Sequence, residues 1–210
     1  MQQSFTVKLS VLVLIGLMTQ SCVNLKPREN ETRFFVLGTP VIEASSVMHA
    51  GGEGVVIGLR RLELAAYLDT PQIVVRIGTN EVQFSDTHRW GEDLAQSINR
   101  VVADLIKDNA AIQYVDIVPW AAGTSHDYVV EIGVDKFEGY LTSAGSPLIM
   151  AAHLEAHWKI FDPASNKVLK QGVTTEMVQG RAAGYSTLVS GLEQTLLKLE
   201  ADLVSAVAGL

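Results

Sequence analysis

Two short segments of this 210-residue chain carry side chains that could bind a metal ion or attack a substrate. His153 and His157 flank a glutamate, but their segment alternates like a β-strand, in which residues four apart lie about 13 Å apart. Two ligands of one zinc ion cannot be that far apart, so we expect these histidines at the surface of a strand. Ser125, His126 and Asp127 are adjacent, whereas a catalytic triad is assembled from separate segments. Neither segment predicts catalysis or a metal site.

The single cysteine follows an apolar run at the N-terminus. Residues 10–18 are almost entirely apolar, and the chain becomes polar directly after Cys22. An apolar run of this length is typical of a signal peptide and too short to span a bilayer, which needs about 20 residues. A single thiol also excludes a disulfide framework and any zinc site built from several cysteines.

The surroundings of Cys22 resemble the lipobox of bacterial lipoproteins, whose usual pattern is Leu-small-small-Cys. Ser21 fits the small position, whereas Gln20 is large and Thr19 replaces the usual leucine. This resemblance implies that Cys22 receives a diacylglycerol group and an N-acyl chain such as palmitate. The alternative is an ordinary secretory signal that is cut near an incidental cysteine.

The lipobox divides the chain into three parts. Residues 1–21 are the expected signal peptide, residues 22–32 the lipidated cysteine with a polar tether, and residues 33–210 a single domain. Val23 follows the cysteine where an aspartate would retain a lipoprotein at the inner membrane. By analogy with enteric lipoproteins, we expect a lipid-anchored protein on the periplasmic face of the outer membrane.

The composition predicts a folded domain and argues against binding to nucleic acid. Hydrophobic residues make up 48% of the chain and charged residues 19%, which is enough apolar material for a core. The chain has 16 basic and 23 acidic residues, for a net charge of −7. A chain this acidic is poorly suited to bind phosphate backbones.

Alternation and helical spacing predict an α+β fold. Apolar residues recur at helical spacing over 91–108 and 186–207, which predicts two amphipathic helices. Alternating or β-rich segments predict strands over 33–37, 54–64, 73–77, 81–84, 112–118, 127–140, 148–161 and 168–178. This order predicts a two-layer domain with a mostly antiparallel sheet and two main helices packed on one of its faces.

Two segments resemble the signatures of a known family. Residues 67–76 read Tyr-Leu-Asp-Thr-Pro-Gln-Ile-Val-Val-Arg, and residues 88–94 read His-Arg-Trp-Gly-Glu-Asp-Leu. They are similar to the YLDRPQIVxR and RWAEPL signatures of the ABC-type transport auxiliary lipoproteins, the PqiC/YmbA group. Residues 34–37 and 158–162 resemble the family's opening Tyr-Tyr-x-Leu and its late tryptophan strand. Thr70 stands where arginine is common.

This resemblance implies a subunit of an Mce/ABC-type intermembrane lipid transport system. The protein would dock a periplasm-spanning, Mce-domain partner at the outer membrane, with a phospholipid or similar lipid as cargo, and so maintain envelope integrity. The family has no known catalytic residues, so we expect no enzyme and no cofactor beyond the acyl chains. A homo-oligomer is compatible with this role. The alternative is a structural or assembly lipoprotein, similar to a pilotin, for another envelope complex.

The candidate partner-binding residues come from the two signatures. They are Tyr67, Asp69, Arg76, Arg89 and Trp90. In one interpretation these side chains contact the partner. In the other, the tryptophan is buried where the helix starts and the arginines pair with local acids such as Asp69 or Glu92.

A lipid path needs apolar surface that a packed domain of this size does not enclose. We therefore expect any path between subunits or between this protein and its partner. The apolar segment 145–152 is a candidate for such a surface, and the alternative is the ordinary start of a buried strand.

Overall fold

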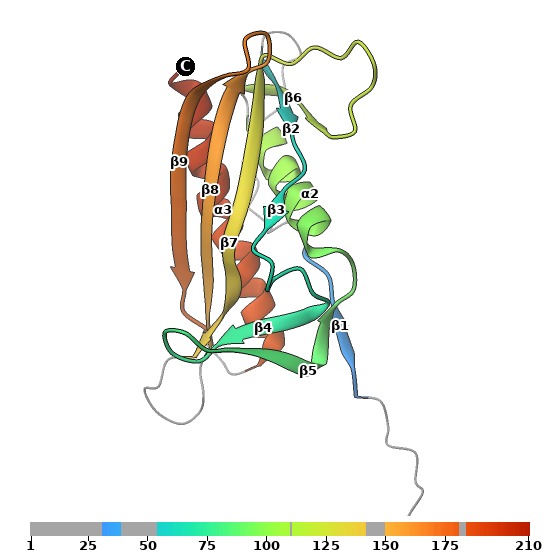
Figure 1. Ribbon diagram of the computed structural model, residues 1–210, viewed down its shortest axis with the longest axis vertical. Coiled ribbons are helices and arrows are strands. Elements are labelled where there is room, and N and C mark those ends of the chain that lie inside the picture. The colour runs from blue at the N-terminus through green and yellow to red at the C-terminus, as the bar shows by residue number, and fades with distance from the viewer. Residues whose placement is uncertain (1–30, 39–53, 110, 142–149, 181–183) are drawn as a thin grey trace, which may run out of the picture. The chain divides into compact units, whose positions relative to one another are not determined.

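The computed structural model describes residues 31–38, 54–109, 111–141, 150–180 and 184–210 (Figure 1). The expected lipidation site Cys22, the signal peptide, most of the tether and residues 145–149 lie outside these ranges. The described elements are β1 (Arg33–Phe35), β2 (Val55–Leu59), β3 (Glu63–Leu64), β4 (Gln72–Arg76), β5 (Val82–Trp90), α2 (Leu94–Lys107), β6 (Ile112–Ile117), β7 (Tyr128–Leu141), β8 (Met150–Asp162), β9 (Lys167–Val178) and α3 (Tyr185–Ala208).

Strand β7 is the centre of the sheet. Along one edge it pairs with the full length of β8, which in turn pairs with β9. Along its other edge three short strands follow one another: β2 near Val129, β3 near Gly133 and β4 near Gly139. Strand β6 extends the sheet beyond β2, and β5 and β1 extend it beyond β4. The long strand therefore holds together segments that are far apart in the sequence.

The sheet is mixed, which corrects the expectation of a mostly antiparallel sheet. Only β4–β5, β7–β8 and β8–β9 are antiparallel. The pairs β1–β5, β2–β6, β2–β7, β3–β7 and β4–β7 are parallel. The antiparallel partners follow one another in the sequence, whereas the parallel partners of β7 are all separated from it by long stretches of chain.

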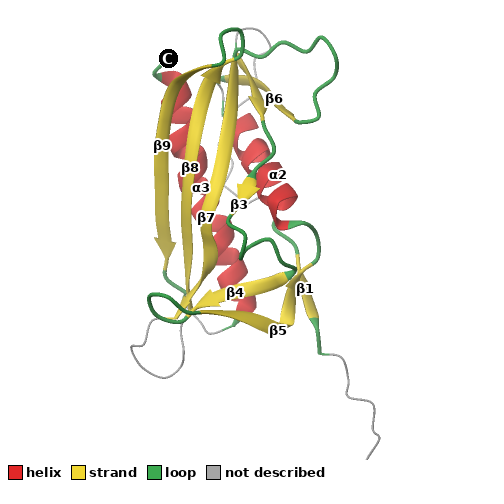
Figure 2. Cartoon of the chain, viewed as in Figure 1, coloured by secondary structure: helices red, strands yellow, loops and turns green. Residues whose placement is uncertain are grey.

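Both helices bury an apolar face. Figure 2 shows α3 lying along strands β7, β8 and β9 with α2 beside it. Leu192, Leu196 and Leu199 of α3 are fully buried, as are Ile98 and Val102 of α2. None of the helices in the described ranges is long and apolar enough to cross a membrane.

Several helix and strand boundaries differ from those predicted from the sequence. The single strand expected over 54–64 is divided into β2 and β3, and the strand expected to end at Phe84 continues to Trp90 because β1 pairs with its second half. Helix α2 begins at Leu94, because the side chain of Asp93 caps it by accepting a hydrogen bond from the Gln96 N–H at 2.8 Å.

Candidate functional site

The first signature forms a tight turn that leads into β4. Within the turn the Leu68 N–H donates to the Ala65 carbonyl and the Thr70 N–H to the Leu68 carbonyl, each at 2.8 Å. The side chain of Leu68 is buried, whereas that of Asp69 is exposed. Since the buried leucine fixes the turn to the core, Asp69 is held at the surface in a defined position.

The second signature joins the end of β5 to the start of α2. Trp90 is buried, with only 6% of its surface exposed, and its ring lies 6.2 Å from that of Phe137 on β7. The backbone N–H of Trp90 donates to the Pro71 carbonyl at 2.7 Å, which ties the two signatures together. The next residue, Gly91, donates its N–H to the carbonyl of Phe35 on β1 at 2.7 Å.

The two signatures together line one groove of about 330 Å³. Its lining residues are Leu68, Asp69, Thr70, Pro71, Trp90, Gly91, Glu92, Asp93 and Leu94. Three of these carry carboxylates and none carries a basic side chain. The groove is therefore acidic and suits a partner segment that presents a lysine or arginine.

Two of the three carboxylates also have local partners. Glu92 accepts a hydrogen bond from Ser97 and pairs with Arg100 at 2.7 Å. The serine hydroxyl, and then the arginine, hold the pKa of Glu92 below its usual value. Asp93 caps α2, so Asp69 is the groove carboxylate for which the described residues show no hydrogen bond or ion pair.

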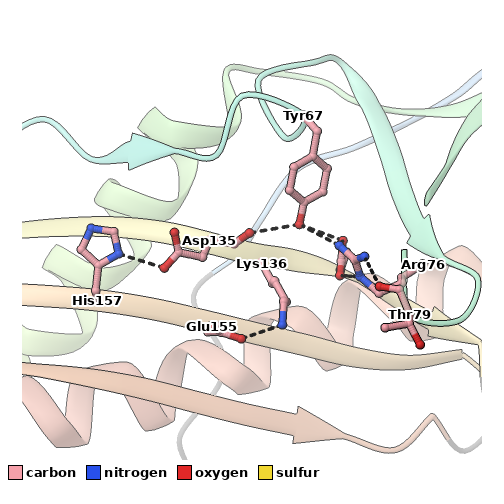
Figure 3. A network of polar contacts seen from close by, with 8 residues as sticks. Tyr67, Arg76, Thr79, Asp135, Lys136, Glu155 and His157 are labelled. Carbon is pink, nitrogen blue, oxygen red and sulfur yellow. Dashed lines mark hydrogen bonds and ion pairs between the residues drawn. The ribbon is translucent and has the colours of Figure 1, made fainter. Parts of the chain in front are cut away.

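Beneath the turn, the side chains of Tyr67 and Arg76 lie close together (Figure 3), and both bind the carboxylate of Glu138 on β7. The Tyr67 hydroxyl lies 2.9 Å from the Glu138 carboxylate and 3.0 Å from the Asp135 carbonyl. The Arg76 guanidinium holds both oxygens of the same carboxylate, through Nε to one and Nη2 to the other at 3.2 Å, while Nη1 donates to the Thr79 carbonyl. We call Tyr67, Arg76 and Glu138 the clasp, because it joins the turn, β4 and β7.

The clasp is shielded from water at its centre. Glu138 has no exposed side-chain surface, and the side chain of Arg76 is 16% exposed. Burial, followed by the nearby charge of Glu138, raises the pKa of Tyr67, so its hydroxyl stays protonated and donates. The hydrogen bond that Arg76 donates to Glu138 likewise raises the pKa of Arg76. These side chains face inward and hold the turn in shape.

The remaining candidates occupy separate places. The side chain of Arg89 is half-buried, and its Nε has no hydrogen-bond partner within the described residues. Arg76 pairs with Glu138, which is remote in sequence, and not with the nearby Asp69. Glu138 was absent from the candidates because a bulge between Val134 and Lys136 shifts the alternation of β7, which hides the position of this residue from a simple pattern.

The segments first considered for chemistry have other partners. His157 is exposed and lies 2.9 Å from Asp135, but His153 is buried, which corrects the expectation that both histidines lie at the surface. His126 lies 3.2 Å from Asp116, and the carboxylate of Asp127 accepts the N–H of Val56. In the described part of the chain no three His, Cys, Asp or Glu side chains gather as a metal site would require.

A second and larger groove, of about 430 Å³, lies over β7 and β8. Its walls mix both signs of charge, with Arg60, Arg61 and Lys159 facing Glu63 and Glu131. Because side chains of both signs line it and Arg60 already pairs with Glu131, this groove selects no ligand class by its charge.

Solved structures share this fold. The chain matches a crystal structure of protein XCC0632 from Xanthomonas campestris with a TM-score of 0.69 and 18% identity, covering 85% of this chain and 97% of that one. A second crystal structure, of an uncharacterised protein, matches with a TM-score of 0.65 and 11% identity over 84% and 98% of the two chains. At such identities the likeness concerns the fold alone. No curated protein sequence matches the chain.

The sequence comparison is more specific. The model of the ABC-type transport auxiliary lipoprotein component family matches residues 35–204, which include both signatures, the clasp and most of α3. The resemblance drawn from the signatures is thereby confirmed. The chain belongs to the ABC-type transport auxiliary lipoprotein component family.

Proposed function

We propose that this protein is an outer-membrane lipoprotein subunit of an Mce/ABC-type intermembrane lipid transport system. Its role is to dock the periplasm-spanning component at the outer membrane, and it performs no catalysis itself. The observation that carries the proposal is that the two signatures of a transport-auxiliary family meet in one acidic surface groove. A surface built jointly by both signatures explains why they occur together.

We assign roles to four of the five candidate residues from their positions at or below the groove, and none to Arg89. Asp69 contacts the partner, because its carboxylate is exposed and unengaged within the described residues. Trp90 forms the wall of the groove, and Tyr67 and Arg76 fix the turn through the buried Glu138. The partner segment presents a basic side chain to Asp69, since opposite charges favour both correct docking and rapid association.

Lipidation of Cys22 complements the groove by anchoring the protein to the membrane at which the partner arrives. Each buried CH₂ group of an acyl chain contributes about 0.8 kcal/mol, so several chains hold a protein firmly in a bilayer. The ten residues between Cys22 and Arg33 reach about 30 Å when extended. This tether keeps the groove close to the membrane and raises its effective concentration for a partner that arrives there.

The anchor is tested by changing Cys22 to alanine. We expect the variant to leave the membrane fraction and to be recovered in the soluble periplasm. Mass spectrometry of the wild-type protein should show an acylated Cys22 as its first residue. A Cys22→Ala variant that still sediments with the outer membrane would disprove the anchor.

Docking is tested by co-purification from detergent-solubilised membranes. We expect the wild-type chain to retain an Mce-domain protein, and Asp69→Lys to retain at least about tenfold less. Asp86→Lys is the matched control, because Asp86 is an exposed aspartate of β5 outside the groove. Recovery of a secretin or another pore in place of the Mce protein would favour the assembly lipoprotein and overturn the proposal.

A further inference from the structure

Strand β9 forms a long open edge of the sheet. In the described part of the chain it pairs only with β8, so the backbone N–H and C=O groups along its other side have no strand partner. The other edge strands of the described sheet are shorter, with three residues in β1, two in β3 and six in β6 against twelve in β9. An open edge of this length is a template for another strand.

The usual protections of an edge strand are weak here. A bulge at Leu169 interrupts the pairing with β8, but Lys170–Val178 pairs without a break and contains no proline. Natural edges are often guarded by a lysine. The Lys170 ammonium, however, donates to the carbonyl of Ala206 at the end of α3, at 2.8 Å, and so lies over the helix face of the sheet.

The edge also carries exposed apolar side chains. Val173 is 66% exposed and Met177 is 42% exposed, and since they are four residues apart they project from the same face. Val173, at the middle of the strand, is as exposed as any large apolar side chain in the described ranges. An apolar side chain at this position favours contact with an equally apolar surface.

We propose that β9 pairs antiparallel with β9 of a second copy of this chain, about a two-fold axis at Val173. In this register Val173 lies opposite Val173 of the second copy. Lys170 lies opposite Glu176 of the second copy, and Glu176 opposite its Lys170, so symmetry creates two ion pairs. Within the described residues the Glu176 carboxylate has no hydrogen bond or ion pair, which leaves it available.

Charge selects this register over its neighbours. An axis at Thr174 places Lys170 opposite Val178 and Glu176 opposite Gly172, which removes both ion pairs and the contact between the two valines. An axis at Gly172 places Lys170 opposite Thr174, with the same loss. Opposite charges directly across an antiparallel pair stabilise it, and two symmetric pairs double this preference.

The position of α3 allows the two copies to approach. This helix contacts β8 through Gly191 against Ala152, and β9 through Asp202 and Thr174. A helix over the space between β8 and β9 lies about one strand spacing, roughly 5 Å, from the proposed axis. The two α3 helices would then lie on the same face about 10 Å apart, which is the usual distance between packed helices.

The test uses the full-length protein in its membrane and introduces one cysteine at a time. Val173→Cys should form a disulfide-linked dimer on oxidation, because directly opposed residues of an antiparallel pair have Cα atoms about 4.5–5.5 Å apart, within disulfide range. Thr175→Cys is the matched control, since the two copies of this residue would be about 13 Å apart in this register. The wild-type chain controls for cross-linking through Cys22.

The register is tested with two chains at once. Chains that carry Gln171→Cys mixed with chains that carry Thr175→Cys should cross-link to each other, because these positions lie opposite in the proposed pair. A cross-link of Thr175→Cys to itself, or a cross-link pattern that follows another register, would overturn the proposal. Mass measurement of the detergent-solubilised wild type should give dimers or multiples of dimers, and a monomer would also overturn it.

Reversal of the charges at Lys170 and Glu176 distinguishes an effect on strand pairing from an effect on folding. Lys170→Glu should raise the dissociation constant of the dimer by at least about tenfold, because two attractions become two repulsions. The double variant Lys170→Glu with Glu176→Lys should restore dimerisation, since the pairs are only reversed. Failure of the double variant to dimerise while it remains folded by circular dichroism would overturn the proposed register. The outcome is independent of whether an Mce protein co-purifies.

Discussion

Two glutamates of strand β7 each pair with an arginine, but only one of these pairs is buried. The side chains of Arg60 and Glu131 are 39% and 36% exposed, whereas those of Arg76 and Glu138 are 16% and 0% exposed. An exposed pair gains little because water screens it, and its net contribution is about 0–1 kcal/mol. Loss of one partner from a buried pair leaves an uncompensated charge, which costs about 3–5 kcal/mol.

The comparison shows what the first signature does. The buried pair lies under the turn that shapes the acidic groove, and Tyr67 and Arg76 of the signature both bind Glu138. The exposed pair belongs to the second groove, where the charges are mixed. Two residues of the signature thus shape the groove from within, while Asp69 faces outward.

The largest effect should come from Glu138→Ala. This variant leaves the half-buried Arg76 guanidinium and the Tyr67 hydroxyl without their acceptor, so we expect a loss of about 3 kcal/mol in the free energy of unfolding. Urea denaturation at neutral pH measures it. The double variant Arg76→Met with Glu138→Leu should recover most of the loss, because it removes both charges. A Glu138→Ala variant within 1 kcal/mol of wild type would contradict the role of the clasp.

A smaller effect is expected from Tyr67→Phe. Removal of the hydroxyl deletes a hydrogen bond to a buried carboxylate, which is worth about 1.5 kcal/mol. The same urea denaturation measures it. Tyr114→Phe is the matched control, since Tyr114 is 52% exposed on β6 and should change stability by less than about 0.5 kcal/mol. Equal effects from the two variants would show that the Tyr67 hydroxyl has no special role.

The clasp should also limit stability at high pH. The pKa of Tyr67 is raised in the fold, so its contribution is complete below the pKa of an unfolded tyrosine, about 10, and is lost as the pH rises towards the folded value. Phenolate absorbance should show that Tyr67 resists ionisation until the protein unfolds. In Tyr67→Phe that resistant tyrosine should be missing. Complete ionisation of the folded wild type near pH 10 would refute the shift.

The smallest effect is expected from Glu131→Ala. Because the Arg60–Glu131 pair is more than one third exposed, we expect a loss below about 1 kcal/mol, and a smaller loss in high salt. Urea denaturation at low and high ionic strength measures both values. A loss as large as that of Glu138→Ala would remove the distinction between the two pairs.

Periodicity predicted where the helices and strands lie better than which strands pair with one another. The helix expected over 91–108 corresponds to α2 (Leu94–Lys107), and the long strands near 127–140, 148–161 and 168–178 correspond to β7, β8 and β9. Alternation shows which side chains share a face, but it does not show which strand lies alongside. Hairpin neighbours can be inferred from their turns, whereas the parallel pairs of β7 depend on contacts between distant segments.

The same limit applies to the site. The two signatures drew attention to Tyr67, Asp69 and Trp90, and the structure brings them to one corner of the sheet. Glu138 is the acceptor that gives two of the candidates their role, and neither its burial nor its partners could be inferred. The burial of Glu138 depends on β4 lying beside β7, and no local sequence pattern predicts this pairing.

The short strand β1 has a mechanical consequence. Its three residues pair in parallel with His88, Arg89 and Trp90, and the carbonyl of Phe35 accepts the N–H of Gly91. A pull on the chain from the N-terminal side therefore loads β1 in shear and transmits tension to the end of β5, where the second signature begins. Tension on the tether would therefore deform the acidic groove before it disturbed the long strands.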